Sequence, residues 1–82
     1  MMKVSEALRV SYKNQFGIVN ENYESSVLLD SLVMTTEEIN ETYREKHTNV
    51  ISEQRAENKV KELRAKAKRI IDDLTKMSKR VS

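Results

Sequence analysis

At 82 residues the chain is long enough for one small domain, and a folded monomer of this size buries only about 60–65% of its unfolded surface. Charged residues make up 34% of the sequence and aromatic residues 5%, with one Gly and no Pro, a composition typical of long helices rather than of sheets. The absence of Cys excludes disulfides and thiolate metal sites, so self-association or a partner is the remaining source of stability. No apolar run is long enough to span a membrane, and we expect a cytoplasmic protein.

The net charge of +2 conceals a strong polarity along the chain. Residues 35–58 carry six Glu and three basic side chains, whereas residues 59–82 carry nine basic and three acidic side chains. An acidic middle followed by a basic end is the main electrostatic property of the sequence. It favours antiparallel packing of the two segments, and it makes the basic segment a candidate surface for anionic partners.

The first helix is expected from Val4 to Phe16, where apolar residues recur every four positions. Gly17 follows the last of them, where a left-handed C-terminal cap favours glycine. A second helix is expected from Asn20, a good N-cap, to residue 34, and the two helices would form a hairpin over residues 1–34. The residues expected to face inward on the second helix are Tyr23, Val27, Leu28, Leu32 and Met34.

A third helix is expected to start at Thr35, because Thr35 and Glu38 have the spacing of a capping box. No Gly or Pro interrupts the chain after this point, and the uninterrupted helix would be about 68 Å long. Residues 48–52 have modest helix propensity, so the alternative is a turn near Asn49 that folds the long helix back on itself. The predicted fold is all-α, with a short N-terminal helical hairpin followed by a long coiled-coil-forming helix over residues 35–82, in one structural domain.

The clearest pattern is an apolar seam in the last third of the chain, with spacings that alternate between four and three. Such spacing is typical of the a and d positions of a coiled coil, and it identifies a helix that needs another helix against it. A parallel homodimer would set Lys59 against Arg64 of its mate, so we expect an antiparallel homodimer. Packing within the chain and a dedicated foreign partner are the alternatives. The predicted association seam comprises Ala56, Val60, Leu63, Ala67, Ile70, Leu74, Met77 and Val81.

The same segment carries many basic side chains, which are suited to neutralising nucleic-acid phosphates. The alternative is a solvated face of a coiled coil. That alternative is favoured because no aromatic residue lies beyond Tyr43 for base stacking, and because Glu62, Asp72 and Asp73 dilute the patch. The candidate contacts to nucleic acid or to another anion are Lys59, Lys61, Arg64, Lys66, Lys68, Arg69 and Lys76.

Residues 26–33, with the pattern Ser-x-x-Leu-Asp-x-Leu-Val, resemble the Ser-x-x-Leu-Asp core of the small sporulation-regulator phosphatases. Members of that family are short helical hairpins that act on a phosphorylated response regulator, and the resemblance implies that Asp30 is the acting carboxylate. It covers eight residues, and the upstream half of the family's pattern does not register against residues 8–17. The expected third helix is extra, so we do not assign the chain to this family.

The sequence contains no pattern typical of a catalytic or metal site. His47 has no Cys or second His to complete a zinc site, and the adjacent Asp72 and Asp73 would point about 100° apart on a helix. We therefore expect a non-enzymatic protein without a cofactor that acts by helix contact on an unidentified protein target. A dimeric adaptor, inhibitor or assembly component, of the kind common in phages and mobile elements, fits this description. Nucleic-acid binding through residues 59–80 is the alternative.

Overall fold

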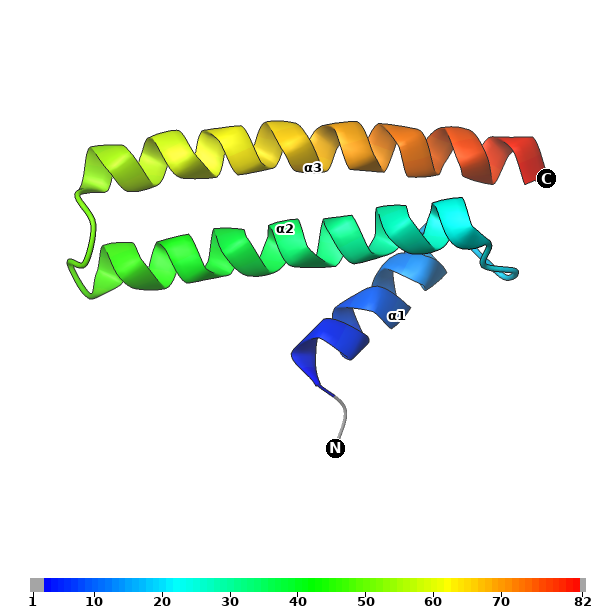
Figure 1. The fold of residues 1–82 in the computed structure, drawn as a ribbon, viewed down its shortest axis with the longest axis horizontal. Coiled ribbons are helices and arrows are strands. Elements are labelled where there is room, and N and C mark those ends of the chain that lie inside the picture. Colours follow the sequence, from blue (N-terminus) through cyan, green and yellow to red (C-terminus); the bar gives the residue numbers. More distant parts are fainter. Residues whose placement is uncertain (1–2, 82) are drawn as a thin grey trace.

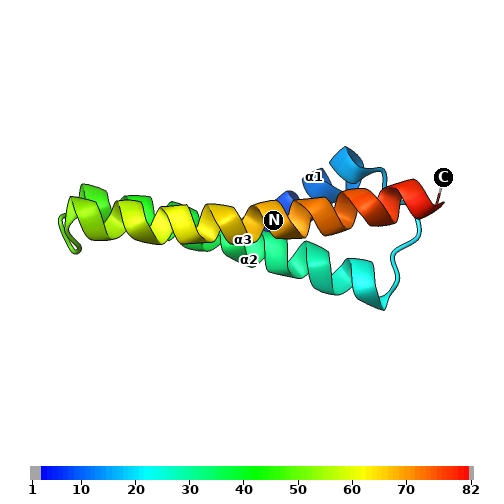
Figure 2. The same ribbon diagram turned by 90° about the horizontal axis from the view of Figure 1, so that it is seen from above.

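The computed structural model describes residues 3–81, and the side chains of residues 3–77. It contains three helices: α1 (Val4–Phe16), α2 (Tyr23–His47) and α3 (Glu53–Val81). α2 and α3 lie antiparallel along the length of the molecule, and α1 lies across the N-terminal part of α2 (Figure 1). Seen from above, α1 and α2 diverge beneath the C-terminal half of α3 (Figure 2). One end of the molecule is therefore a three-helix bundle, and the other end is a two-helix hairpin.

α1 has the bounds predicted for the first helix, and it ends at the predicted glycine. Gly17 takes the left-handed conformation, with φ 66°, and its N–H donates to the carbonyl oxygen of Asn14. The N–H of Ile18 donates to the carbonyl oxygen of Lys13 at 2.9 Å. These two bonds form a Schellman motif, which satisfies carbonyls that the end of the helix leaves free.

α2 differs from the prediction at both of its ends. It begins after Asn22 rather than Asn20, since the Asn22 side chain accepts from the N–H of Ser25 and Ser25 Oγ accepts from the N–H of Asn22. It then continues through the expected boundary at residues 34 and 35. Thr35 is not an N-cap, because it lies in the middle of α2. Its side chain is buried, and its hydroxyl donates to the carbonyl oxygen of Ser31 at 2.7 Å. The predicted short hairpin followed by one long helix is therefore wrong, and the hairpin is formed by α2 and α3.

The expectation of one helix through residues 48–52 is also wrong, and the alternative of a turn near Asn49 describes the chain. Asn49 has φ 60°, and the N–H of Val50 donates to the carbonyl oxygen of Glu45 at 2.9 Å. This is again a Schellman motif, with Asn in the place that Gly17 has at the end of α1. Ser52 then starts α3, because its Oγ accepts from the N–H of Arg55 at 3.3 Å.

The apolar core lies at the three-helix end of the molecule. Leu29 and Leu32 of α2 pack with Ile70 and Leu74 of α3, and each of these side chains is at most 7% exposed. Burying each of them contributes about 1.5–3 kcal/mol. Five partly buried side chains complete this core, and two of them are aromatic side chains of α1. The five are Tyr12, Phe16, Ile18, Leu28 and Ala67.

Candidate interaction surfaces

The predicted association seam is placed on the side of α3 that faces α2 of the same chain. Its residues Ile70 and Leu74 belong to the shared core, and Ala56, Val60 and Leu63 are also buried. Ala67 and Met77 are half-buried, whereas the side chain of Val81 lies outside the described residues. The antiparallel packing expected between two copies thus occurs within one chain, as in the alternative that turns near Asn49.

The polarity of charge along the chain does not produce a ladder of ion pairs between α2 and α3. Among residues 3–77, the ion pair that joins these two helices is Lys46 with Glu53, with 3.7 Å between Lys46 Nζ and Glu53 Oε1. Tyr43 also connects them, because its hydroxyl accepts a hydrogen bond of 2.8 Å from Arg64. Exposed pairs of this kind stabilise by about 0–1 kcal/mol each. The packing of the two helices therefore depends mainly on buried side chains.

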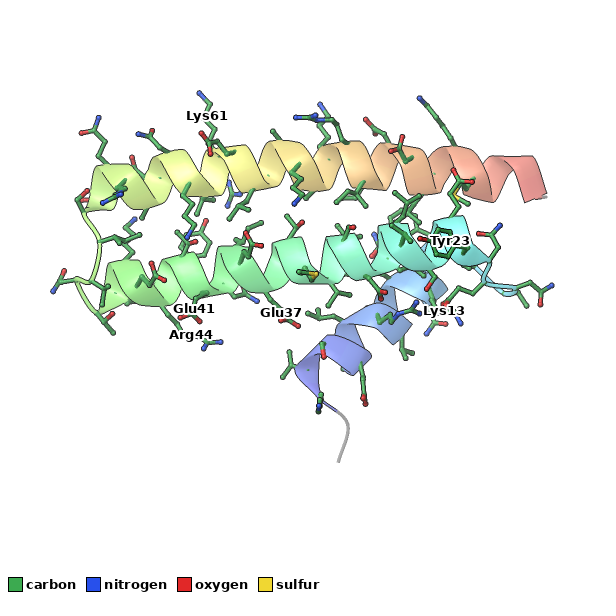
Figure 3. The ribbon with its side chains drawn as sticks, in the orientation of Figure 1. Lys13, Tyr23, Glu37, Glu41, Arg44 and Lys61 are labelled. Atoms are coloured by element: carbon green, nitrogen blue, oxygen red, sulfur yellow. The ribbon has the colours of Figure 1, made fainter. Side chains whose placement is uncertain are left out.

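The basic residues of α3 are exposed over the surface of the helix that is not buried against α2, and one of them, Arg64, reaches Tyr43 of α2. All seven predicted anion contacts are exposed, and Figure 3 shows Lys61 pointing away from α2. Within the part of the chain whose side chains are described, none of the seven makes an ion pair with a carboxylate. This basic face comprises Lys59, Lys61, Arg64, Lys66, Lys68, Arg69 and Lys76.

α2 has a stripe of its own on the side turned away from α3, and Met34 in this stripe borders a shallow depression shared with Arg9 of α1. Three residues expected to face inward lie there instead: Tyr23 is 86%, Val27 44% and Met34 62% exposed. Glu38 and Glu41, which are exposed, and Glu45, which is half-buried, continue the stripe with the same helical spacing. Figure 3 shows Glu41 directed away from α3. We call these six residues the α2 stripe, which is apolar at one end and acidic at the other.

The apolar periodicity predicted the wrong face for these three residues because α2 carries apolar side chains on several faces. The side that faces α3 uses Ser25, Thr35 and Thr42 as well as leucines, and all three are at most 4% exposed. The Thr42 hydroxyl donates to the carbonyl oxygen of Glu38 at 2.8 Å. Because each hydroxyl is satisfied within its own helix, threonine packs here as a small side chain. An apolar periodicity alone does not reveal such positions.

Arg9 of α1 is the centre of a polar network that fastens α1 to α2. It pairs with both carboxylate oxygens of Glu21, and its Nε donates to Asp30 at 2.9 Å. Another of its nitrogens donates to Ser26 Oγ, and Lys13 lies 3.6 Å from Glu21. The hydrogen bonds that Arg9 donates lower the pKa of Glu21 to about 2, and donating to Glu21 and Asp30 raises the pKa of Arg9. The carboxylate suggested by the resemblance, Asp30, therefore serves this network.

The hairpin is open at its loop end. A depression there is lined by Tyr43, Lys46, His47 and residues 49–53, and a second one beside it shares Tyr43 and Lys46. The buried side chains nearest this end are small: Thr42 on α2 and Ala56 on α3. The loop end is therefore held by less apolar burial than the three-helix end.

In the described part of the chain, no set of three or more His, Cys, Asp or Glu side chains is placed to hold a metal ion. None of the described helices is apolar enough over a sufficient length to cross a membrane. Comparison with models of known protein families gives no match, and neither the curated proteins nor the solved structures include one that matches this chain.

Proposed function

We propose that this chain is a small, non-enzymatic, cytoplasmic protein–protein interaction module that binds a helix of its target along the α2 stripe. The observation that carries this proposal is the exposure of Tyr23, Val27 and Met34 on one face of α2. A helix at the surface ordinarily presents charged and polar residues to water on that face. Three large apolar side chains at helical spacing provide anchors for a partner helix of the kind that docks by residues three, four and seven apart.

The acidic half of the stripe specifies the chemistry of the partner. Glu38, Glu41 and Glu45 follow the apolar residues toward the loop end of α2, and Glu37 is exposed beside them. Met34, Glu37, Glu38 and Glu41 line one shallow depression. A complementary helix carries apolar residues at one end and Lys or Arg at the other. Charge of this kind selects the partner and its orientation, while the apolar contacts supply most of the affinity.

Affinity capture from the organism that encodes the chain tests this proposal with two matched variants. Met34→Lys places a charge in the stripe, and Val50→Lys places the same charge on a loop residue of similar exposure, 69% against 62%. We expect one protein to be retained by the wild type and by Val50→Lys, and to be lost with Met34→Lys. Anchor residues typically contribute 2 kcal/mol or more, so the purified pair should bind about 30-fold more weakly or worse. Equal retention by all three proteins would refute the role of the stripe.

A second candidate function is the binding of a polyanion such as nucleic acid along the basic face of α3. It is supported by the exposure of all seven basic side chains and by the absence of carboxylate partners for them in the described part. Lys61 and Lys68 are one heptad apart and lie on the same line of the helix. We expect Lys61→Gln/Lys68→Gln to weaken retention on DNA or RNA, which should itself fall steeply as salt increases. No retention at low salt would exclude this function.

A further inference from the structure

The interface between α2 and α3 follows a single heptad register that passes through the loop between them. Thr42 is buried near the end of α2 and Ala56 near the start of α3. Between them, Lys46, Asn49 and Glu53 continue the alternation of four and three residues without an insertion or a deletion. A hairpin loop is under no requirement to keep this register, because it connects two separate helices.

The register determines what the chain would look like if the loop became helical. In a straight helix the side of α2 that faces α3 and the seam of α3 would drift apart by about 20° per heptad. A left-handed supercoil removes this drift, and both surfaces then lie on one seam. A continuous helix from Tyr23 to Val81 would therefore expose one coiled-coil face along its whole length.

The loop is composed of residues that a helix accepts. Residues 48–52 contain neither Gly nor Pro. Asn49 follows the C-terminal end of α2, and its φ of 60° is the one positive value of a non-glycine residue in the described chain. Gly17 ends α1 with nearly the same φ, 66°, without a steric penalty. The end of α1 is thus fixed by its residue type, whereas α2 is followed by a residue that also adopts the helical conformation.

We propose that two copies of this chain exchange their α3 helices, with residues 48–52 completing one continuous helix in each copy. The result is an antiparallel dimer in which α2 of each copy packs on α3 of the other. Every buried contact between α2 and α3 is kept, because the same residues meet across the two copies. α1 remains on its own α2 through the Arg9 network.

The middle of this dimer has polar residues that suit its two-fold axis. Lys46 and Glu53, which form an ion pair in the hairpin, would pair between the copies on both sides of the axis. Asn49 would occupy a d position next to the axis. A polar residue at such a position fixes the register of a coiled coil at some loss of stability. The α2 stripe stays exposed in both the hairpin and the exchanged dimer, so the exchange is independent of the partner proposed for that stripe.

Two substitutions at Asn49 shift the exchange in opposite directions. Asn49→Gly keeps the left-handed turn without strain and weakens a helix, whereas Asn49→Ala strains the turn and favours a helix. At each hinge, the difference between Ala and Gly should shift the equilibrium between hairpin and continuous helix by about tenfold or more. The dimer contains two hinges, so the Kd for dimerisation should be at least about 100-fold lower for Asn49→Ala than for Asn49→Gly. Sedimentation equilibrium of full-length protein, refolded at each concentration, measures both constants.

Asn58→Ala and Asn58→Gly are the matched control pair. Asn58 is exposed on α3 and outside the hinge, so these substitutions change helix propensity by the same amount and should leave the Kd nearly equal. Small-angle scattering then identifies the form of the dimer. A continuous helix is about 88 Å long, against a longest extent of 45 Å for the hairpin.

Hydrogen exchange supplies the last readout, since the amides of residues 51–53 should become protected in the exchanged dimer. If Asn49→Ala and Asn49→Gly are both folded monomers up to submillimolar concentration, the proposal is wrong. It is equally wrong if a dimer forms that keeps the length of the hairpin and leaves these amides unprotected.

Discussion

Arg9 Nε of α1 donates a hydrogen bond of 2.9 Å to Asp30 of α2, while the rest of the same guanidinium binds Glu21 in the segment between the two helices. α1 has no fully buried residue, so this network and the aromatics Tyr12 and Phe16 position it. The network fixes the short helix by charge as much as by apolar burial.

The network makes stability depend on pH in the acid range. Because the pKa of Glu21 falls to about 2 in the folded chain from an ordinary value of 4.5, the folded state favours the ionised form. Its contribution is complete above about pH 5 and is lost as the pH falls toward 2. We expect Glu21→Gln to unfold at a lower temperature than the wild type at pH 6, and the difference to shrink as the pH falls to 2. Thermal unfolding followed by circular dichroism at each pH measures it. A difference that stays constant over this range would contradict the assignment.

Truncation of a fully buried side chain in the core should reduce the free energy of unfolding. Leu74 is fully buried among Leu29, Leu32 and Ile70, so Leu74→Ala should reduce the free energy of unfolding by about 2–5 kcal/mol. Lys68→Ala, on the exposed side of the same helix, should change it by less than about 0.5 kcal/mol. Urea denaturation of both variants provides the comparison. Similar losses for the two would mean that α3 does not pack on α2 through the seam.

The buried threonines allow a test of how the hairpin packs near its loop end. In Thr42→Val the Glu38 carbonyl keeps the backbone hydrogen bond of the helix, so no buried polar group is left without a partner. We expect this variant to be as stable as the wild type or more stable by up to about 1 kcal/mol. Thr42→Ser removes the methyl group and should cost about 1 kcal/mol. Both are measured by urea denaturation, and a severe loss in the valine variant would show that the hydroxyl has another role.

The end of α1 should be sensitive to backbone conformation alone. A Cβ at Gly17 would meet no atom within 4 Å, yet φ is 66°. Gly17→Ala should therefore cost about 1–2 kcal/mol, all of it from the left-handed conformation. Gly17→Asn should cost less, because Asn tolerates this conformation, as it does at Asn49. If the alanine and asparagine variants lose the same stability in thermal unfolding, the left-handed φ of Gly17 does not determine the cost of replacing it.

The parts of the fold that were predictable are those with a local physical signal. Gly17 is the one glycine and follows an apolar periodicity, and this was sufficient to define α1 and its end. The all-helical class followed from composition. The seam of α3 was evident because Leu63, Ile70 and Leu74 stand among charged residues, so that the apolar face has a sharp contrast.

The remaining features depend on contacts that are distant in sequence. Thr35 has the residue type and spacing of an N-cap, but its burial against α3 keeps it inside α2. Asn49 takes the left-handed conformation that Gly17 takes after α1, but asparagine takes it less often than glycine, so its signal in the sequence is weaker. The apolar pattern of α2 did not distinguish its exposed side from the side that faces α3. Met34 was therefore expected to face inward, and the α2 stripe was not predicted. The partner of the seam, α2 itself, became evident only from the turn at residues 48–52.

The most direct test of the interaction module is a pair of amide nitrogen–proton spectra of the isotope-labelled chain, with and without the purified protein that it captures. The result expected is that the perturbed amides follow Tyr23, Val27 and Met34 and then Glu38, Glu41 and Glu45 along the exposed side of α2. Perturbations confined to the basic face of α3, with the amides of the α2 stripe unchanged, would contradict the proposed function.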